Sequence, residues 1–162
     1  MTGFFEGFDP VFDGESRLLI LGSFPSVKSR KEGFYYGNPQ NRFWKTVCGY
    51  FGESVPFTIA EKRDFLLRRK LALWDVVTAC EIDGSKDHSI RNERVADLPA
   101  LLSKSKIKRI FCNGGKSFEL LEREFPALKE IAQKLPSTSP ANPRFSVEVW
   151  HRAFNEVFYD HL

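Results

Sequence analysis

Four short stretches rich in apolar residues recur along this chain, and each is followed by polar or glycine-bearing residues and then by a helix-like pattern. The stretches are residues 17–23 (RLLILGS), 71–78 (LALWDVVT), 109–115 (RIFCNGG) and, with a weaker pattern, 128–137 (LKEIAQKLPS). Runs that are apolar throughout are typical of strands covered on both faces. Strands that alternate with helices imply right-handed crossovers. The pattern therefore predicts an α/β fold, a three-layer α/β/α sandwich around a central, mainly parallel four-stranded sheet.

Between these stretches, apolar side chains recur at helical spacing. The expected helices cover residues 41–51, 59–70, 97–103, 116–125 and 145–162. Asp97 is a plausible N-cap followed closely by Pro99, and the last helix has Ser146 or Asn142 near its start. No internal repeat, linker or low-complexity segment interrupts the 162 residues, so we expect a single domain over 1–162.

The composition excludes several classes of protein. Cys48, Cys80 and Cys112 form no C-x-x-C pair for zinc or an iron–sulfur cluster, so a reducing compartment is expected. No stretch approaches the ~18 apolar residues of a membrane span, and the acidic N-terminus does not resemble a targeting signal. We therefore expect a soluble protein of the cytoplasm or nucleoid, without a membrane partner. The net charge of +3 permits a polyanionic partner without requiring one.

In sheets of this kind, ligands bind beyond the carboxyl ends of the strands. That rule selects four segments, which are GSFPS (22–26), DVVTACEIDGSKDHS (75–89), NGGKS (113–117) and LPSTSPAN (135–142). All four are rich in small polar residues, a composition that structural loops share. NGGKS is not a phosphate-binding P-loop, because Ile110 stands where that motif needs its first glycine. It is either a tight turn, with Gly114 and Gly115 in unusual conformations and Asn113 capping the next helix, or an amide that faces a ligand.

Taken together, LILGSFPSVKS, YYGNPQNRFW, LWDVVTACEIDGS, FCNGGKS and LPSTSPAN resemble the uracil-DNA glycosylase superfamily, and within it most closely the hypoxanthine-DNA (deoxyinosine) glycosylases. The resemblance covers residues 17–142 in the superfamily's order and spacing. Phe24 departs from the pattern, since many members carry an aspartate or asparagine there to position the hydrolytic water. The resemblance places the catalytic asparagine in YYGNPQN, at Asn38, with Asn41 as the alternative.

The resemblance also implies how a base extruded from the duplex is bound. Tyr36 matches the aromatic that stacks on the base, with Tyr35 or Phe24 as the opposite wall, while Phe43 and Trp44 are expected to pack the following helix into the core. Backbone amides of Ser23 and its neighbours are candidates to bind the departing base. Asp75 as a carboxylate can accept from N1–H of hypoxanthine, or it instead caps a turn or pairs with a basic residue. Asn113 is a second candidate reader of the base edge.

The implied activity is removal of hypoxanthine from double-stranded DNA that contains this deaminated base, by a monomer that needs neither a cofactor nor a metal. No lysine nucleophile is implied, so the expected product is an intact abasic site. Contacts to the DNA backbone are expected from the serine-rich loops and basic residues, which are Ser26, Lys28, Arg30, Lys86, Ser137, Ser139 and Asn142. The alternatives are a uracil or mismatch-type glycosylase of the same fold and a non-catalytic nucleic-acid-binding relative, which Phe24 favours.

Overall fold

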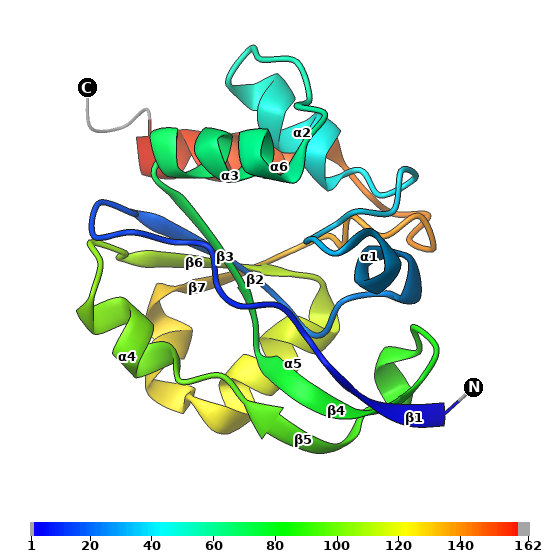
Figure 1. The fold of residues 1–162 in the computed structure, drawn as a ribbon. Helices are drawn as coiled ribbons and strands as arrows, with labels where there is room; N and C mark the ends of the chain where they lie inside the picture. The colour runs from blue at the N-terminus through cyan, green and yellow to red at the C-terminus, as the bar shows by residue number, and fades with distance from the viewer. Residues whose placement is uncertain (1, 159–162) are drawn as a thin grey trace.

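The computed structural model of the protein describes residues 2–158 and contains a four-stranded parallel sheet (Figure 1). Its strand order is β3 (Leu71–Asp75), β2 (Leu18–Gly22), β6 (Arg109–Asn113) and β7 (Ala132–Leu135). All three neighbouring pairs are parallel. Each of the four expected stretches supplies one of these strands, which confirms the predicted sheet.

Helices cover both faces of this sheet, as the apolar runs predict. Along β2, Leu18 and Ile20 face one buried cluster, whereas Leu19 and Leu21 face the other. The helices α2 (Phe43–Tyr50), α3 (Ile59–Arg68) and α6 (Val147–Phe158) lie on the first face (Figure 1). The helices α4 (Leu98–Ser103) and α5 (Gly115–Glu124) cover the second. The three-layer α/β/α architecture is therefore confirmed.

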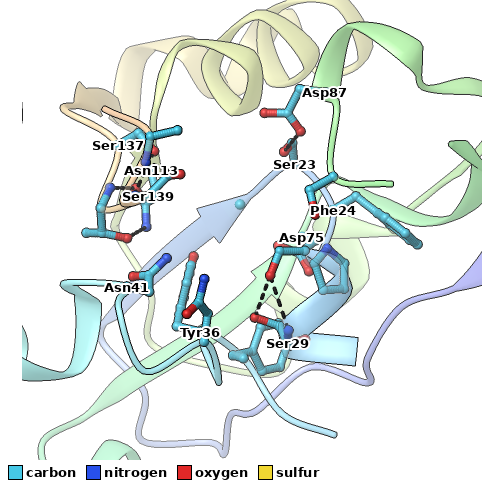
Figure 2. Close-up of a pocket in the computed structure, with 18 of the residues that line it drawn as sticks. Ser23, Phe24, Ser29, Tyr36, Asn41, Asp75, Asp87, Asn113, Ser137 and Ser139 are labelled. Carbon is cyan, nitrogen blue, oxygen red and sulfur yellow. Dashed lines mark hydrogen bonds between the residues drawn. The ribbon is translucent and has the colours of Figure 1, made fainter. Parts of the chain in front are cut away.

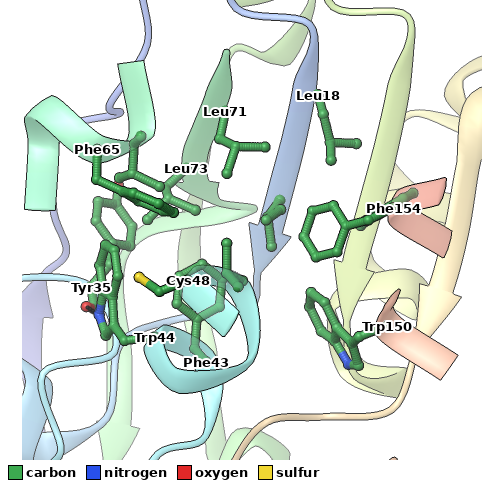
Figure 3. Packing of buried hydrophobic residues seen from close by; sticks show 14 of the residues in the cluster. Leu18, Tyr35, Phe43, Trp44, Cys48, Phe65, Leu71, Leu73, Trp150 and Phe154 are labelled. Atoms are coloured by element: carbon green, nitrogen blue, oxygen red, sulfur yellow. Dashed lines mark hydrogen bonds between the residues drawn. The ribbon is translucent and has the colours of Figure 1, made fainter. Parts of the chain in front are cut away.

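The first core cluster is rich in aromatic rings and holds two segments that lead to the ligand edge of the sheet (Figure 3). Phe43 and Trp44 are buried in it, as expected. The indole N–H of Trp44 donates to the Tyr35 carbonyl at 3.0 Å, and that of Trp150 donates to the Pro136 carbonyl at 2.8 Å. Since a buried indole needs a partner for its N–H, these bonds tie both segments to the core.

A second sheet was not expected. It is antiparallel, with β4 (Val77–Asp83) between β1 (Thr2–Glu6) and β5 (Arg91–Val95). The expected strand 71–78 thus ends at Asp75, and the segment predicted as a loop continues as β4. Both outer strands are short and largely exposed, and β5 is also charged, so they lack the continuous apolar signal of buried strands.

The remaining elements are short. They are α1 (Val27–Glu32) and the 3₁₀ helices η1 (Asp87–Ser89) and η2 (Pro126–Ile131), none of which was predicted. Asp97 caps α4 as expected, accepting from the Ala100 N–H at 3.1 Å. Ser146, rather than Asn142, lies at the start of α6, and the expected continuation over 159–162 lies outside the described residues. None of the described helices is long and apolar enough to cross a bilayer.

Candidate active site

A cavity of about 310 Å³ opens at the carboxyl ends of β2, β3 and β6. Its lining residues come from every segment selected at the strand ends and from the loop after α1, and they are Gly22 to Ser26, Ser29, Tyr35, Tyr36, Asn38, Asn41, Asp75, Ser85, Asp87, Asn113 and Ser137 to Ala141. Figure 2 shows Asn113, Ser137 and Ser139 on one side of this space, with Ser23 and Asp87 on another. The four segments selected from the sequence therefore do meet at one place. Within residues 2–158, no group of three or more His, Cys, Asp or Glu side chains is placed to hold a metal ion.

The floor of the cavity is formed where β2 and β3 end side by side. Gly22 pairs with Asp75 in the strand register, and a Cβ at position 22 would overlap Oδ1 of the Asp75 carboxyl. Asp75 is only 5% exposed, and its Oδ2 has no hydrogen-bond partner among the described residues. Burial raises the pKa of Asp75 to about 8, and the nearby carboxyl of Asp87 contributes in the same direction. Within the described part of the chain, Asp75 has no cationic partner for Oδ2 and is favoured in its neutral form at pH 7.

Tyr36 forms the aromatic wall. Its backbone is left-handed, with φ of 54°, which is uncommon for a bulky residue and often found at functional sites. Its ring stacks on Phe43 with a centroid distance of 4.1 Å and an interplanar angle of 19°. Its hydroxyl is buried and has no hydrogen-bond partner of good geometry among the described residues. Burial raises the pKa of Tyr36, the Asp75 carboxyl raises it further and the Asn113 side chain lowers it, so the hydroxyl keeps its proton.

Tyr35 and Phe24, the other two aromatic residues proposed as walls, have their side chains packed in the protein interior. Tyr35 is buried, and its hydroxyl donates to the carbonyls of Phe8 at 3.2 Å and Asp9 at 2.7 Å. Phe24 is buried in the second core cluster, where its ring lies 5.4 Å from the guanidinium carbon of Arg30, and Figure 2 shows this ring pointing away from the cavity. Both residues line the cavity, but Tyr36 provides its aromatic face.

Asn38 and Asn41 both line the cavity, and each uses its side-chain oxygen to fold the loop locally. Asn38 Oδ1 accepts from the Gln40 N–H at 3.0 Å, and Asn41 Oδ1 accepts from the Phe43 N–H at 2.9 Å at the start of α2. Such Asx turns are a common way for asparagine to shape a loop. Each carboxamide still has an NH₂ group and a second oxygen lone pair to offer a ligand.

Asn113 clamps two loops together. Its Nδ2 donates to Thr138 Oγ1 at 2.9 Å, and its Oδ1 accepts from the Thr138 N–H at 2.9 Å. The predicted cap is wrong, since Gly114, with φ of 101°, is the N-cap of α5 and makes no side-chain bond. Gly115 has no positive φ, contrary to the expected pair of unusual glycines. Asn113 lines the cavity, and the donor and acceptor positions of its side chain that do not bind Thr138 can face a ligand.

The loop that contains Ser137 and Ser139 is braced by Arg42, which the sequence reasoning missed. Arg42 Nη2 donates to the carbonyls of Ser139 at 2.7 Å and Asn142 at 2.8 Å, and the Arg42 backbone N–H donates to the Thr138 carbonyl at 3.0 Å. These partners lie roughly a hundred residues along the chain, so no local pattern indicates the contact. Asn142 does not line the cavity, and its Nδ2 donates to the Ser137 carbonyl at 2.9 Å.

The remaining residues predicted for the site divide into two groups. Ser23 and Ser26 line the cavity, where Ser23 Oγ donates to Asp87 at 2.8 Å and Ser26 caps α1. Lys28 is exposed outside the lining. Arg30 donates to the carbonyls of Pro25 and Gly84, and Lys86 forms an ion pair with Asp83 at 3.1 Å. Asp87 and Ser29 were missed, although Asp87 lies within a segment that the strand-end rule selected.

The lining as a whole suits an uncharged, flat, polar-edged ligand. It combines one aromatic face with hydroxyls, carboxamides, the Asp75 carboxyl that burial favours in its neutral form and, at the rim, the Asp87 carboxyl that accepts from Ser23, and its residues include no lysine, arginine, histidine or cysteine. A nucleobase has this character, since it offers a π face and an edge of hydrogen-bond donors and acceptors.

Comparison with known proteins agrees with this geometry. The family model of the uracil DNA glycosylase superfamily matches residues 10–157. A hypoxanthine DNA glycosylase from Methanosarcina acetivorans is 36% identical over 141 residues, which cover 86% of this chain and 89% of the relative. A hypoxanthine DNA glycosylase from Methanosarcina barkeri is 35% identical over the same shares.

A solved structure shares the fold as well. The solution NMR structure of a candidate uracil DNA glycosylase from Methanosarcina acetivorans superimposes with a TM-score of 0.83 and 34% identity. The match covers 96% of this chain and 99% of that chain. Because the family model spans most of the chain and the relatives exceed 30% identity over most of its length, the chain belongs to the uracil DNA glycosylase superfamily.

Proposed function

We propose that this protein is a monofunctional DNA glycosylase that excises hypoxanthine from deoxyinosine-containing DNA in base excision repair. The observation that carries the proposal is the cavity at the strand ends, where the Tyr36 ring, the Asp75 carboxyl and the asparagine amides face one space. Two relatives bear the name hypoxanthine DNA glycosylase. In this proposal the chain acts as a single glycosylase domain and a monomer, on nucleoid DNA in the cytoplasm.

Base flipping brings the target into the cavity. The glycosidic carbon is shielded inside the duplex, so the base has to leave the stack at a cost of a few kcal/mol. The cavity, at about 310 Å³, lies at the small end of ligand sites, as a single base requires. Phe43 covers one face of the Tyr36 ring, so the base stacks on the opposite face and recovers ~1–3 kcal/mol.

Recognition then depends on the edge of the base. Hypoxanthine presents a carbonyl acceptor at C6 beside a donor at N1–H. In this proposal Asp75 and Asn113 meet that edge, since both line the cavity and Asp75 Oδ2 lacks a partner among the described residues. A base whose edge leaves such buried groups unpaired binds more weakly by about 1–3 kcal/mol for each unpaired group.

Bond cleavage leaves a cationic sugar and a departing base with negative charge. In this proposal Asn38 orients the hydrolytic water, with Asn41 as the alternative, because a cationic sugar attracts even a weak nucleophile. The Ser23 backbone amide stabilises charge on the leaving base, as donors in a dry site do. No lysine lines the cavity, in keeping with hydrolysis to an intact abasic site.

The DNA backbone is proposed to lie over the rim of the cavity, which contains the exposed ends of the serine-rich loops. Ser26, Ser137 and Ser139 supply hydroxyls and backbone amides there, while Lys28 and Asn142 lie beyond the cavity lining. Contacts of this kind position the duplex and carry no sequence information. The substrate is therefore defined by the deaminated base, not by its neighbours.

A base-release assay tests the proposal. Labelled duplexes that contain deoxyinosine, deoxyuridine or deoxyxanthosine are incubated with the protein, and abasic sites are then cleaved with alkali. We expect fastest release from deoxyinosine, with no strand cleavage before alkali. Release from deoxyuridine alone would show a uracil glycosylase of the same fold. Binding of the lesion duplex without release of any base would show the non-catalytic relative.

A further inference from the structure

Two buried polar atoms at the cavity floor have no hydrogen-bond partner among the described residues. They are Oδ2 of Asp75 and the hydroxyl of Tyr36. Buried polar groups are normally paired, so an unpaired one in a native structure needs an explanation. Both residues line the cavity proposed to receive the base.

The two groups converge on one point. A Cβ at position 22 would overlap Asp75 Oδ1 and would lie 3.3 Å from the Tyr36 hydroxyl oxygen. The glycine therefore leaves the carboxyl and the phenol side by side at the floor. Leaving each of them unsatisfied is unfavourable, and a ligand that pairs with both removes that penalty.

The surroundings of Asp75 favour a neutral acid. Burial is the largest cause of its raised pKa and Asp87, from η1, is the second. The other titratable groups that interact with it are the hydroxyls of Tyr35 and Tyr36, which both keep their protons. None of these groups is a cation that would hold Asp75 in the ionised form.

We propose, as an extension of the function proposed above, that Asp75 binds the flipped base as a neutral carboxylic acid, donating one hydrogen bond and accepting another along its lactam edge. In hypoxanthine the carboxyl O–H donates to the C6 carbonyl, and the carboxyl C=O accepts from N1–H. The Tyr36 hydroxyl, beside it, donates a further bond to the same carbonyl. From the sequence, Asp75 was expected to be a carboxylate that only accepts from N1–H. In this proposal Asp75 both donates and accepts.

This arrangement has a consequence for specificity. Uracil also carries an N–H flanked by carbonyls, so the neutral acid pairs with it in the same way. Adenine presents the reverse order of donor and acceptor, which a neutral acid is also able to match. The acid thus selects any base that has a donor and an acceptor side by side on its edge. Rejection of adenine depends on the greater cost of flipping a base out of a correctly matched base pair.

The test compares wild type with Asp75→Asn over pH 6–10 in single-turnover excision of hypoxanthine. Asparagine is neutral throughout and offers a donor and an acceptor in nearly the same shape. We expect the ratio of the Asp75→Asn rate to the wild-type rate to rise about tenfold for each pH unit above about 8. The ratio also cancels the ionisation of hypoxanthine N1–H in alkali, which affects both proteins equally. Asp64→Asn, which removes an exposed carboxyl on α3, is the matched control and should keep the wild-type profile.

A second measurement does not depend on activity. In protein labelled with ¹³C at aspartate carboxyls, the resonance missing from Asp75→Asn should titrate near pH 8 and lie at the position of a neutral acid at pH 7. A wild-type rate that increases through pH 8 relative to Asp75→Asn, or an Asp75 resonance already ionised at pH 7, would overturn the inference. If wild type releases no base from any duplex, the proposed function fails, and the ¹³C titration still decides the state of Asp75.

Discussion

Gly22 and Asp75 face each other across β2 and β3, and the Asp75 carboxyl occupies the space that a side chain at position 22 would need. The strands themselves would tolerate alanine at position 22, because a parallel ladder uses only the backbone. The requirement for glycine comes from the cavity floor. Glycine weakens the strand locally, but its missing side chain leaves room for a buried carboxyl and a buried phenol.

We expect Gly22→Ala to disturb both groups. The new methyl overlaps the carboxyl and crowds the Tyr36 hydroxyl, so the free energy of unfolding should fall by about 1–3 kcal/mol. Base release should fall as the floor is displaced. Urea unfolding and single-turnover excision measure the two effects. Gly49→Ala is the control, because a Cβ added at this position of α2 would meet no atom within 4 Å, and it should be neutral or stabilising by about 0.5–1 kcal/mol. Equal behaviour of the two variants would argue against a crowded floor.

Arg42 should matter for the shape of the loop 137–142. Arg42→Lys keeps the charge but loses the planar guanidinium, whose Nη2 is held in place to donate to both the Ser139 and the Asn142 carbonyls. We expect roughly tenfold weaker binding of lesion duplex, equivalent to about 1.4 kcal/mol, measured by fluorescence anisotropy. Arg63→Lys, at an exposed arginine of α3 that stacks over Phe34, is the matched control and should bind like wild type. Wild-type affinity in Arg42→Lys would mean that the brace is dispensable.

The roles of Asn38 and Asn41 can be distinguished by measuring the excision rate and the stability of each alanine variant. If Asn38 orients the water, Asn38→Ala should slow single-turnover excision by about 10²–10³-fold, comparable to the loss of a preorganised polar group. Asn41→Ala should instead cost about 1 kcal/mol of stability, since Asn41 Oδ1 accepts from the Phe43 N–H at the start of α2. Thermal unfolding of both variants controls for misfolding. An unchanged rate in Asn38→Ala, together with a slow Asn41→Ala, would move the water-orienting role to Asn41.

The raised pKa of Asp75 predicts how stability depends on pH. The folded protein retains a proton on Asp75 that the unfolded chain, with an ordinary value of 3.8, has already lost, so stability falls as pH rises from about 4 to about 8. The contribution has a slope of up to about 1.4 kcal/mol per pH unit. Asp75→Asn removes it, so this variant should gain stability relative to wild type across that range. Urea unfolding at several pH values measures the difference, and parallel curves for the two proteins would contradict it.

Much of the framework follows from local patterns in the chain. The run from Leu18 to Leu21 is apolar on both faces, and this pattern predicted a buried parallel strand with helices above and below. The short charged strand Arg91–Val95 carries no such signal, because an exposed edge strand is stabilised by backbone pairing with β4 and not by apolar periodicity. The second sheet therefore went unpredicted.

The sequence by itself determined which loops meet, because parallel strands present their carboxyl ends at one edge and the polar segments follow those ends. The tertiary structure alone decided what each side chain does there. The Tyr35 hydroxyl is bonded to backbone carbonyls, whereas Tyr36, one residue later, provides the aromatic face of the cavity, and Arg42 donates to the carbonyls of residues 139 and 142. The state of Asp75 was decided in the same way, since a pKa depends on burial and on neighbouring charges that only the folded chain assembles.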